Sequence, residues 1–124
     1  MDKNLIITSV KLQGKPSSKI EIKKKQKALI ERKKFDQPSQ IKTCGSTFKN
    51  TKNKKAWKLI KESNCQNFRV GSARISEKHC NFFVNEGKAT AKDLEDLIIK
   101  VKETVYQKTK TNLELEIKII GYKN

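Results

Sequence analysis

The sequence predicts an α+β fold, a small antiparallel sheet with two to three helices, in a chain of 124 residues. Three observations predict it: a helical apolar stripe after residue 90, an alternating apolar segment near the C-terminus, and short strand-like runs between residues 68 and 84. Helices mixed with separated strands are typical of α+β proteins. The mass of 14.3 kDa allows one modest hydrophobic core.

The first predicted element is a strand over residues 5–12, where apolar side chains partly alternate with polar ones. A helix is predicted from about residue 19 to residue 34, because Ser18 and Glu21 have the spacing of a capping box. The apolar stripe of this helix is narrow and consists of Ile22, Leu29 and Ile30.

The middle of the chain predicts shorter elements. A helix over about residues 55–62 is expected to bury Trp57 and Ile60. Two short strands are expected near residues 68–70 and 81–84, and we expect the aromatic side chains of this region to belong to the core: Trp57, Phe82 and Phe83.

The last third carries the two strongest patterns. Thr90 and Asp93 have capping-box spacing, and the helix predicted after them has an apolar face made of Leu94, Leu97, Ile98, Val101 and Val105. Residues 113–120 predict a strand, because apolar residues alternate there with Glu114, Glu116 and Lys118.

The formal net charge of +16 raises the question of an anionic partner. Nucleic acid is an unlikely partner, because only Arg32, Arg69 and Arg74 are arginines, and bidentate contacts to bases and phosphates favour arginine. The chain is also rich in lysine, isoleucine and asparagine, whose codons are A/T-rich, so genome composition explains most of the excess. An anionic ligand remains the alternative explanation.

Cysteine usage and hydropathy predict a cytoplasmic protein. The three cysteines form no C-x-x-C pair and cannot all be paired, which favours a reducing compartment. One histidine and scattered cysteines lack the spacing of a metal site. With a mean hydropathy of -0.76 we expect neither a membrane span nor a signal peptide.

The segment CGSTFKN at residues 44–50 is the most informative motif, because it places a serine at a backbone bend with a cation and an amide close by. Alone it is typical of a turn serine that bonds its own backbone. Further motifs follow in order: AWKLI at 56–60, FRVGSA at 68–73, SEKHCNF at 76–82, ATAKD at 89–93 and LELEIKIIG at 113–121. Together they resemble the C-terminal, substrate-binding domain of UDP-N-acetylenolpyruvoylglucosamine reductase, a flavoenzyme of peptidoglycan synthesis, over roughly residues 44–121.

The resemblance implies that residues 1–43 are the tail of an FAD-binding domain plus a connecting helix, and that residues 44–124 are the substrate-binding domain. It implies FAD and NADPH as cofactors and UDP-N-acetylglucosamine enolpyruvate as substrate. The sequence has no glycine-rich pyrophosphate loop, so we expect the FAD-binding part to be absent from this chain. A separate FAD-binding chain is then a candidate partner.

The resemblance also implies roles for five residues. Ser46 matches the proton donor of the family, and Glu116 matches a glutamate that stabilises the enolic intermediate if burial keeps a proton on it. Asn50 and Lys49 correspond to residues near the substrate diphosphate, and His79 to a polar residue near the phosphates. From the residues alone, Glu116 reads equally well as a solvated carboxylate on a polar strand face, and His79 as a structural histidine.

Two positions depart from the family pattern. Thr51 stands where the family usually has proline, so we expect a looser loop after Asn50. Ser72 stands where the family has a second glycine, and a positive φ there would strain it. Three interpretations stay open: a catalytic half that assembles with an FAD-binding chain, an inactive truncated remnant, and a basic nucleic-acid-binding module.

Overall fold

A computed structural model describes residue 6, residues 8–38 and residues 41–121. The chain divides into two compact units, Met1–Glu31 and Arg32–Asn124. No helix within the described ranges is long and apolar enough to cross a bilayer.

The first unit contains an exposed N-terminal segment and most of helix α1 (Lys19–Asp36). The helix begins as predicted: the Glu21 backbone N–H donates to Ser18 Oγ at 3.2 Å, although the Glu21 carboxylate accepts from Ser17 Oγ at 2.8 Å. No side chain of α1 is buried. The narrow apolar stripe is therefore exposed throughout, with Ile22 at 52%, Leu29 at 67% and Ile30 at 47%.

The strand predicted over residues 5–12 is wrong for the part that the structure describes. Ile6 and residues 8–12 have no regular secondary structure and are exposed, while residues 5 and 7 lie outside the described residues. A strand needs a hydrogen-bonded neighbour, and the four-stranded sheet of the second unit does not include this segment.

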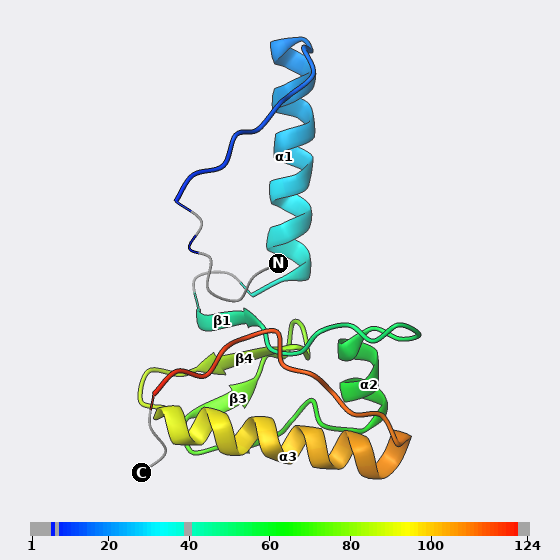
Figure 1. The fold of residues 1–124 in the computed structure, drawn as a ribbon, viewed down its shortest axis with the longest axis vertical. Coiled ribbons are helices and arrows are strands. Elements are labelled where there is room, and N and C mark those ends of the chain that lie inside the picture. The colour runs from blue at the N-terminus through cyan, green and yellow to red at the C-terminus, as the bar shows by residue number, and fades with distance from the viewer. Residues whose placement is uncertain (1–5, 7, 39–40, 122–124) are drawn as a thin grey trace. The chain divides into compact units, whose positions relative to one another are not determined.

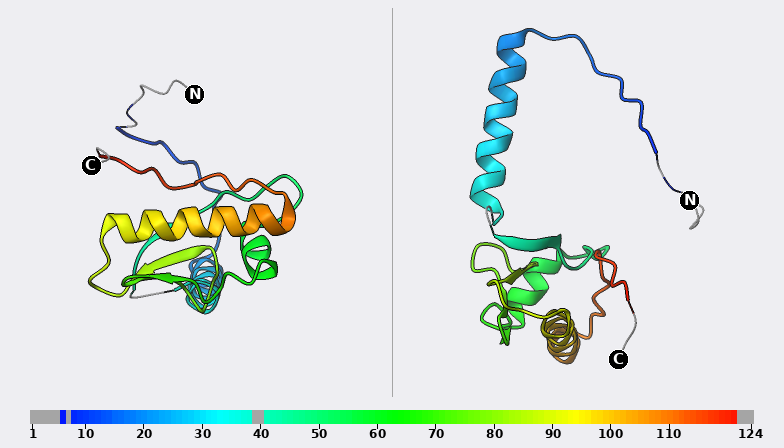
Figure 2. Two further views of the ribbon diagram at one scale, coloured as in Figure 1. Left: turned by 90° about the horizontal axis from the view of Figure 1, so that it is seen from below. Right: turned by 90° about the vertical axis from the view of Figure 1, so that its left-hand side faces the viewer.

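The second unit is an antiparallel sheet with two helices (Figures 1 and 2), which confirms the predicted α+β class. Its strands lie in the order β1-β4-β3-β2 and are β1 (Lys42–Ser46), β2 (Arg69–Val70), β3 (Ala73–Ile75) and β4 (Phe82–Asn85). The helices are α2 (Ala56–Glu62) and α3 (Ala91–Thr109). Strands β1 and β3 were not predicted, because they are short and mostly polar or small.

Helix α3 confirms the prediction from its sequence and packs against β2, β3 and α2. Thr90 and Asp93 form a reciprocal capping box, and the buried face consists of Leu97, Ile98, Val101 and Val105. Gly71 lies against this helix start with φ +52°, and a Cβ there would come within 2.8 Å of the Asp93 carboxylate. Ser72 is not among the residues with positive φ, so the strain expected there is absent.

The core of the second unit joins both helices, the sheet and the C-terminal segment. Phe48 and Phe83 meet edge to face at 5.8 Å between ring centroids, and their buried neighbours include Ile60, Ile75 and Leu113. Phe82 and Phe83 are buried as predicted. Trp57 is only half-buried, so its assignment to the core was wrong.

The strand predicted over residues 113–120 is reduced to a single bridge between Leu115 and Phe48. Two backbone hydrogen bonds flank it, from Glu116 N–H to the Thr47 carbonyl (2.9 Å) and from Lys49 N–H to the Glu114 carbonyl (2.8 Å). The expected alternation is present up to residue 118, although Ile119 is exposed. The ladder stays short because β1 ends at Ser46 and the chain turns toward α2 after Asn50.

Candidate functional site

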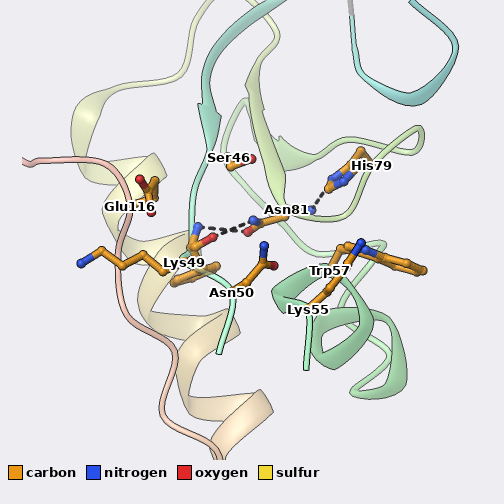
Figure 3. A pocket seen from close by; sticks show the side chains of 9 residues that line it. Ser46, Lys49, Asn50, Lys55, Trp57, His79, Asn81 and Glu116 are labelled. Carbon is orange, nitrogen blue, oxygen red and sulfur yellow. Dashed lines mark hydrogen bonds between the residues drawn. The ribbon is translucent and has the colours of Figure 1, made fainter. Parts of the chain in front are cut away.

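All five residues singled out from the sequence line one cavity of about 470 Å³ (Figure 3). The lining comes from the end of β1, the start of α2, the loop before β4 and the C-terminal segment. It consists of Ser46, Phe48, Lys49, Asn50, Lys55, Trp57, His79, Asn81 and Glu116. This volume lies within the ordinary range of small-ligand sites.

Ser46 reaches the cavity through a bulge in β1. Thr43 pairs with Val84 and Ser46 with Phe82, so two residues of β1 oppose one residue of β4. Gly45 makes this possible with φ +83°, a conformation that costs glycine little. Because of the extra residue, the Ser46 side chain lies on the opposite face of the sheet from the one it would have in a regular strand. The positive φ that the bulge requires explains why a glycine precedes the serine.

Asn81 holds the backbone that follows Ser46. Its buried side chain accepts from the Phe48 N–H at 3.0 Å and donates to the Phe48 carbonyl at 2.8 Å, and its own carbonyl accepts from the Thr47 N–H at 2.8 Å. The amide thus replaces a strand partner for Phe48. No role was predicted for Asn81, because a buried amide that pairs with the backbone leaves no local sequence signal.

His79 lies beside these hydrogen bonds of Asn81 and is itself bonded to Asn81. Its Nδ1 accepts from the Asn81 backbone N–H at 3.2 Å, so the neutral ring carries its proton on Nε2. Burial lowers the pKa of His79 below its ordinary value of 6.5, and a backbone hydrogen bond and the Asp36 carboxylate only partly oppose this effect. The ring also meets Phe82 edge to face at 4.9 Å. His79 is therefore a neutral hydrogen-bonding group at the pocket wall.

Asn50 orders the loop that connects β1 to α2. Its Oδ1 accepts from the Ala56 N–H at 3.1 Å, at the first residue of α2. Thr51 Oγ1 donates to the Lys54 carbonyl at 2.8 Å and accepts from the Lys54 N–H at 3.0 Å, and Lys54 Nζ lies 2.5 Å from the Glu62 carboxylate. Thr51 therefore closes a hydrogen-bonded turn, and the looser loop expected in place of proline is not observed.

The charged groups of the pocket differ in their surroundings. Lys49 Nζ lies 3.8 Å from the Glu114 carboxylate, and in Figure 3 its side chain extends away from Asn50. Lys55 makes no ion pair with any described residue. Glu116 lines the cavity but is exposed, so the described residues do not provide the burial that its expected role requires.

Sequence reasoning missed Trp57 and Lys55 as well as Asn81. A signal for Trp57 was present: Ala56, Leu59 and Ile60 have the i, i+3, i+4 spacing of one helix face, and Trp57 lies outside it. Its indole faces the His79 ring, with 6.4 Å between centroids and 60° between planes.

The donor set of the larger cavity suits an anionic organic ligand. No group of three or more His, Cys, Asp or Glu side chains gathers in the described part of the chain. Two of the three thiols, Cys65 and Cys80, are poor nucleophiles, because burial raises the pKa of each. A second cavity, of about 210 Å³, is too small for a flavin dinucleotide, and it is lined by Pro38, Ile41, Arg74, Ser76, Glu77 and Lys78.

Comparison with known proteins agrees with this geometry. Residues 37–120 match the family described as UDP-N-acetylenolpyruvoylglucosamine reductase, C-terminal domain. Relatives of that name are 46% identical in Wolbachia pipientis wMel, over 95% of this chain and 40% of the relative, and 43% identical in Rhodopseudomonas palustris (strain HaA2), over 97% and 39%. The crystal structure of UDP-N-acetylenolpyruvylglucosamine reductase from Thermus caldophilus superposes with a TM-score of 0.71 at 38% identity, covering 84% of this chain and 36% of that one.

The chain spans about 40% of the length of these curated relatives. The proteins named are reductases, so the comparisons give no support to the nucleic-acid interpretation. The profile match covers most of the second unit, including the bulge at Ser46 and the segment that carries Glu116. The chain therefore belongs to the family of UDP-N-acetylenolpyruvoylglucosamine reductase C-terminal domains.

Proposed function

We propose that this chain supplies the substrate-binding and proton-donating part of a UDP-N-acetylenolpyruvoylglucosamine reductase, with residues 44–124 as the substrate-binding domain. The observation that carries the proposal is the meeting of Ser46, Asn50, His79 and Glu116 around one cavity, although the C-terminal segment is distant from the others in sequence. We place its activity in the cytoplasm, in keeping with the three free cysteines of the described residues.

In this proposal Ser46 donates a proton to the substrate carbon next to the carboxylate. A hydroxyl suits this step because it is small, is positioned by the bulge, and adds no negative charge beside an enolic intermediate. Glu116 lines the same pocket and assists by carrying a proton and donating it in a hydrogen bond to the enol carboxylate, once the bound ligand has covered it.

FAD, reduced by NADPH, would supply the hydride in the family reaction. We propose that the flavin is held by a separate FAD-binding polypeptide. The alternative is that this chain is an inactive remnant, which binds neither an FAD-binding polypeptide nor the substrate.

The experiment purifies the tagged chain from the cells that make it and records the visible spectrum of the product. We expect flavin absorbance and a second polypeptide in equal amount, together with NADPH oxidation that depends on UDP-N-acetylglucosamine enolpyruvate. Ser46→Ala should lower that rate at least about a hundredfold, the ordinary size of a positioned proton donor.

Cys44→Ala is the matched control, because Cys44 lies in the same strand, is exposed and does not line the cavity. It should leave the rate unchanged. A colourless chain without a partner, or a Ser46→Ala rate equal to that of Cys44→Ala, would contradict the proposal and favour the remnant.

A further inference from the structure

We infer that Lys55 and Trp57 form the subsite for the nucleoside diphosphate end of the ligand, with the Lys55 ammonium at the phosphates and the Trp57 indole against the base. This inference rests on the proposed function, which it deepens by assigning residues to one end of the pocket. Neither residue is among the five drawn from the family pattern.

The direction of the pocket is the first argument. In Figure 3, Glu116 and Lys49 lie on one side, Asn50 lies between, and Lys55 and Trp57 lie on the other side. A ligand whose reacting carbon is at Ser46 and Glu116 therefore extends its remaining length past Asn50 toward α2. The end of a sugar nucleotide far from the reacting carbon is the nucleoside diphosphate.

Charge is the second argument. Two lysines line the pocket, but Lys49 is already close to Glu114. Lys55, the other lysine of the pocket, has no ion-pair partner among the described residues, and it is on the side away from Glu116. A diphosphate is attracted to that side, because the Lys55 ammonium has no carboxylate beside it and is free to pair with the phosphates.

The third argument is how the loop places these two side chains. The bond from Ala56 N–H to Asn50 Oδ1 and the turn closed by Thr51 and Lys54 fold the chain back, so that the residues on either side of Ala56 face the cavity. Lys55 precedes α2 and uses its backbone carbonyl for the helix, while its side chain makes no capping bond.

The aromatic surface is the fourth argument. Trp57 lies outside the buried face of α2 and remains half-exposed in the cavity wall, braced by the His79 ring at 6.4 Å. Tryptophan is costly to leave exposed, and a base can stack on its face. Neutral His79 adds no charge beside the indole, whereas the Lys58 ammonium lies 5.7 Å from the centroid of the Trp57 ring.

The test uses the full chain and the fact that Trp57 is its only tryptophan. Uridine diphosphate is titrated while tryptophan fluorescence and heat are both recorded, with inorganic diphosphate as the second probe. We expect uridine diphosphate to bind and to change the fluorescence saturably, and inorganic diphosphate to bind more weakly with little change.

The variants separate the two contacts. Trp57→Ala should weaken uridine diphosphate about tenfold and leave inorganic diphosphate unaffected, while Trp57→Phe should retain most of the affinity because it keeps an aromatic face. Lys55→Ala should weaken both probes about tenfold. Lys52→Ala removes the same charge from an exposed site in the same loop outside the cavity, and it should leave both affinities unchanged.

The outcomes distinguish this inference from the proposed function. If calorimetry detects uridine diphosphate but the fluorescence is silent and Lys55→Ala equals Lys52→Ala, the inference is overturned and the function stands. If neither probe binds, the inference is overturned as well, and the assay of the flavin-containing preparation decides the function by itself.

Discussion

Ser46, Asn81 and His79 owe their places in the pocket to a few directed hydrogen bonds and one bulge. Gly45 provides the bulge before Ser46, and the Asn81 amide binds both backbone groups of Phe48. The Asn81 N–H in turn sets the tautomer of His79. Small changes at any of these residues should therefore alter the site more than their size suggests.

We expect the His79→Asn variant to have a flatter dependence of stability on pH than the original chain. Because burial lowers the pKa of His79 in the folded state, the unfolded state binds a proton first as the pH falls below 6.5. The contribution of neutral His79 is thus present above that pH and is lost as the pH falls through the lower, folded-state pKa.

Urea denaturation at several pH values between 5 and 8 (roughly the range of histidine titration) measures this difference. His79 is the only histidine, so the change belongs to one group. Parallel stability curves for the two proteins would rule out the lowered pKa.

Gly71→Ala should destabilise the chain by about 2–3 kcal/mol, since it adds an unfavourable positive φ to a clash. The new Cβ would lie 2.8 Å from the Asp93 carboxylate, which is half of the capping box of α3. Gly45 also has a positive φ, but a Cβ there would meet no atom within 4 Å. Gly45→Ala therefore measures the loss of stability from the positive φ alone, about 1 kcal/mol. Denaturant midpoints measure both. Equal losses of stability in the two variants would show that the Asp93 side chain moves away from the new Cβ at no cost.

The helices and strands of this chain differ in how far local sequence determines them. The start and the apolar face of α3 were predicted, because its cap and its apolar spacing are both local. The β1 strand was missed, because its strand state comes from pairing with β4 rather than from its own polar residues. Residues 113–120 have a strand pattern, but their partner turns away after one bridge.

The capping box of α3 predicts a matched pair of variants. Thr90→Ala removes the oxygen that accepts from the Asp93 N–H at 3.1 Å and should cost about 1 kcal/mol of stability. Thr90→Ser keeps that oxygen and should cost much less. Thermal and urea unfolding of the three proteins measure the difference. A Thr90→Ser loss as large as that of Thr90→Ala would show that the Thr90 methyl, not the cap, is important.

The core and the candidate site both belong to the second unit. All buried apolar residues in the described ranges lie between Phe48 and Leu113, whereas α1 buries none. The motif order identified the family and five pocket residues. It did not reveal Lys55, Trp57 or Asn81, because their roles depend on how the loop after Asn50 folds back and on which backbone groups lack strand partners.

A chain that lacks residues 1–31 should therefore unfold with nearly the same midpoint as the full chain. Leu113→Ala, by contrast, removes a side chain that is 2% exposed and should cost about 3 kcal/mol. Circular dichroism during heating measures both. A large loss of stability in the shortened chain would mean that the first unit supports the second.

The two backbone hydrogen bonds that join residues 47–49 to residues 114–116 also have a consequence for synthesis on the ribosome. The bulge in β1, Asn81 and the loop before α2 all emerge before α3, while Glu116 emerges after it. Translation thus supplies Ser46 well before Glu116, and the core that supports the pocket also needs α3 and Leu113, so the site can be completed only after the last described segment has left the exit tunnel.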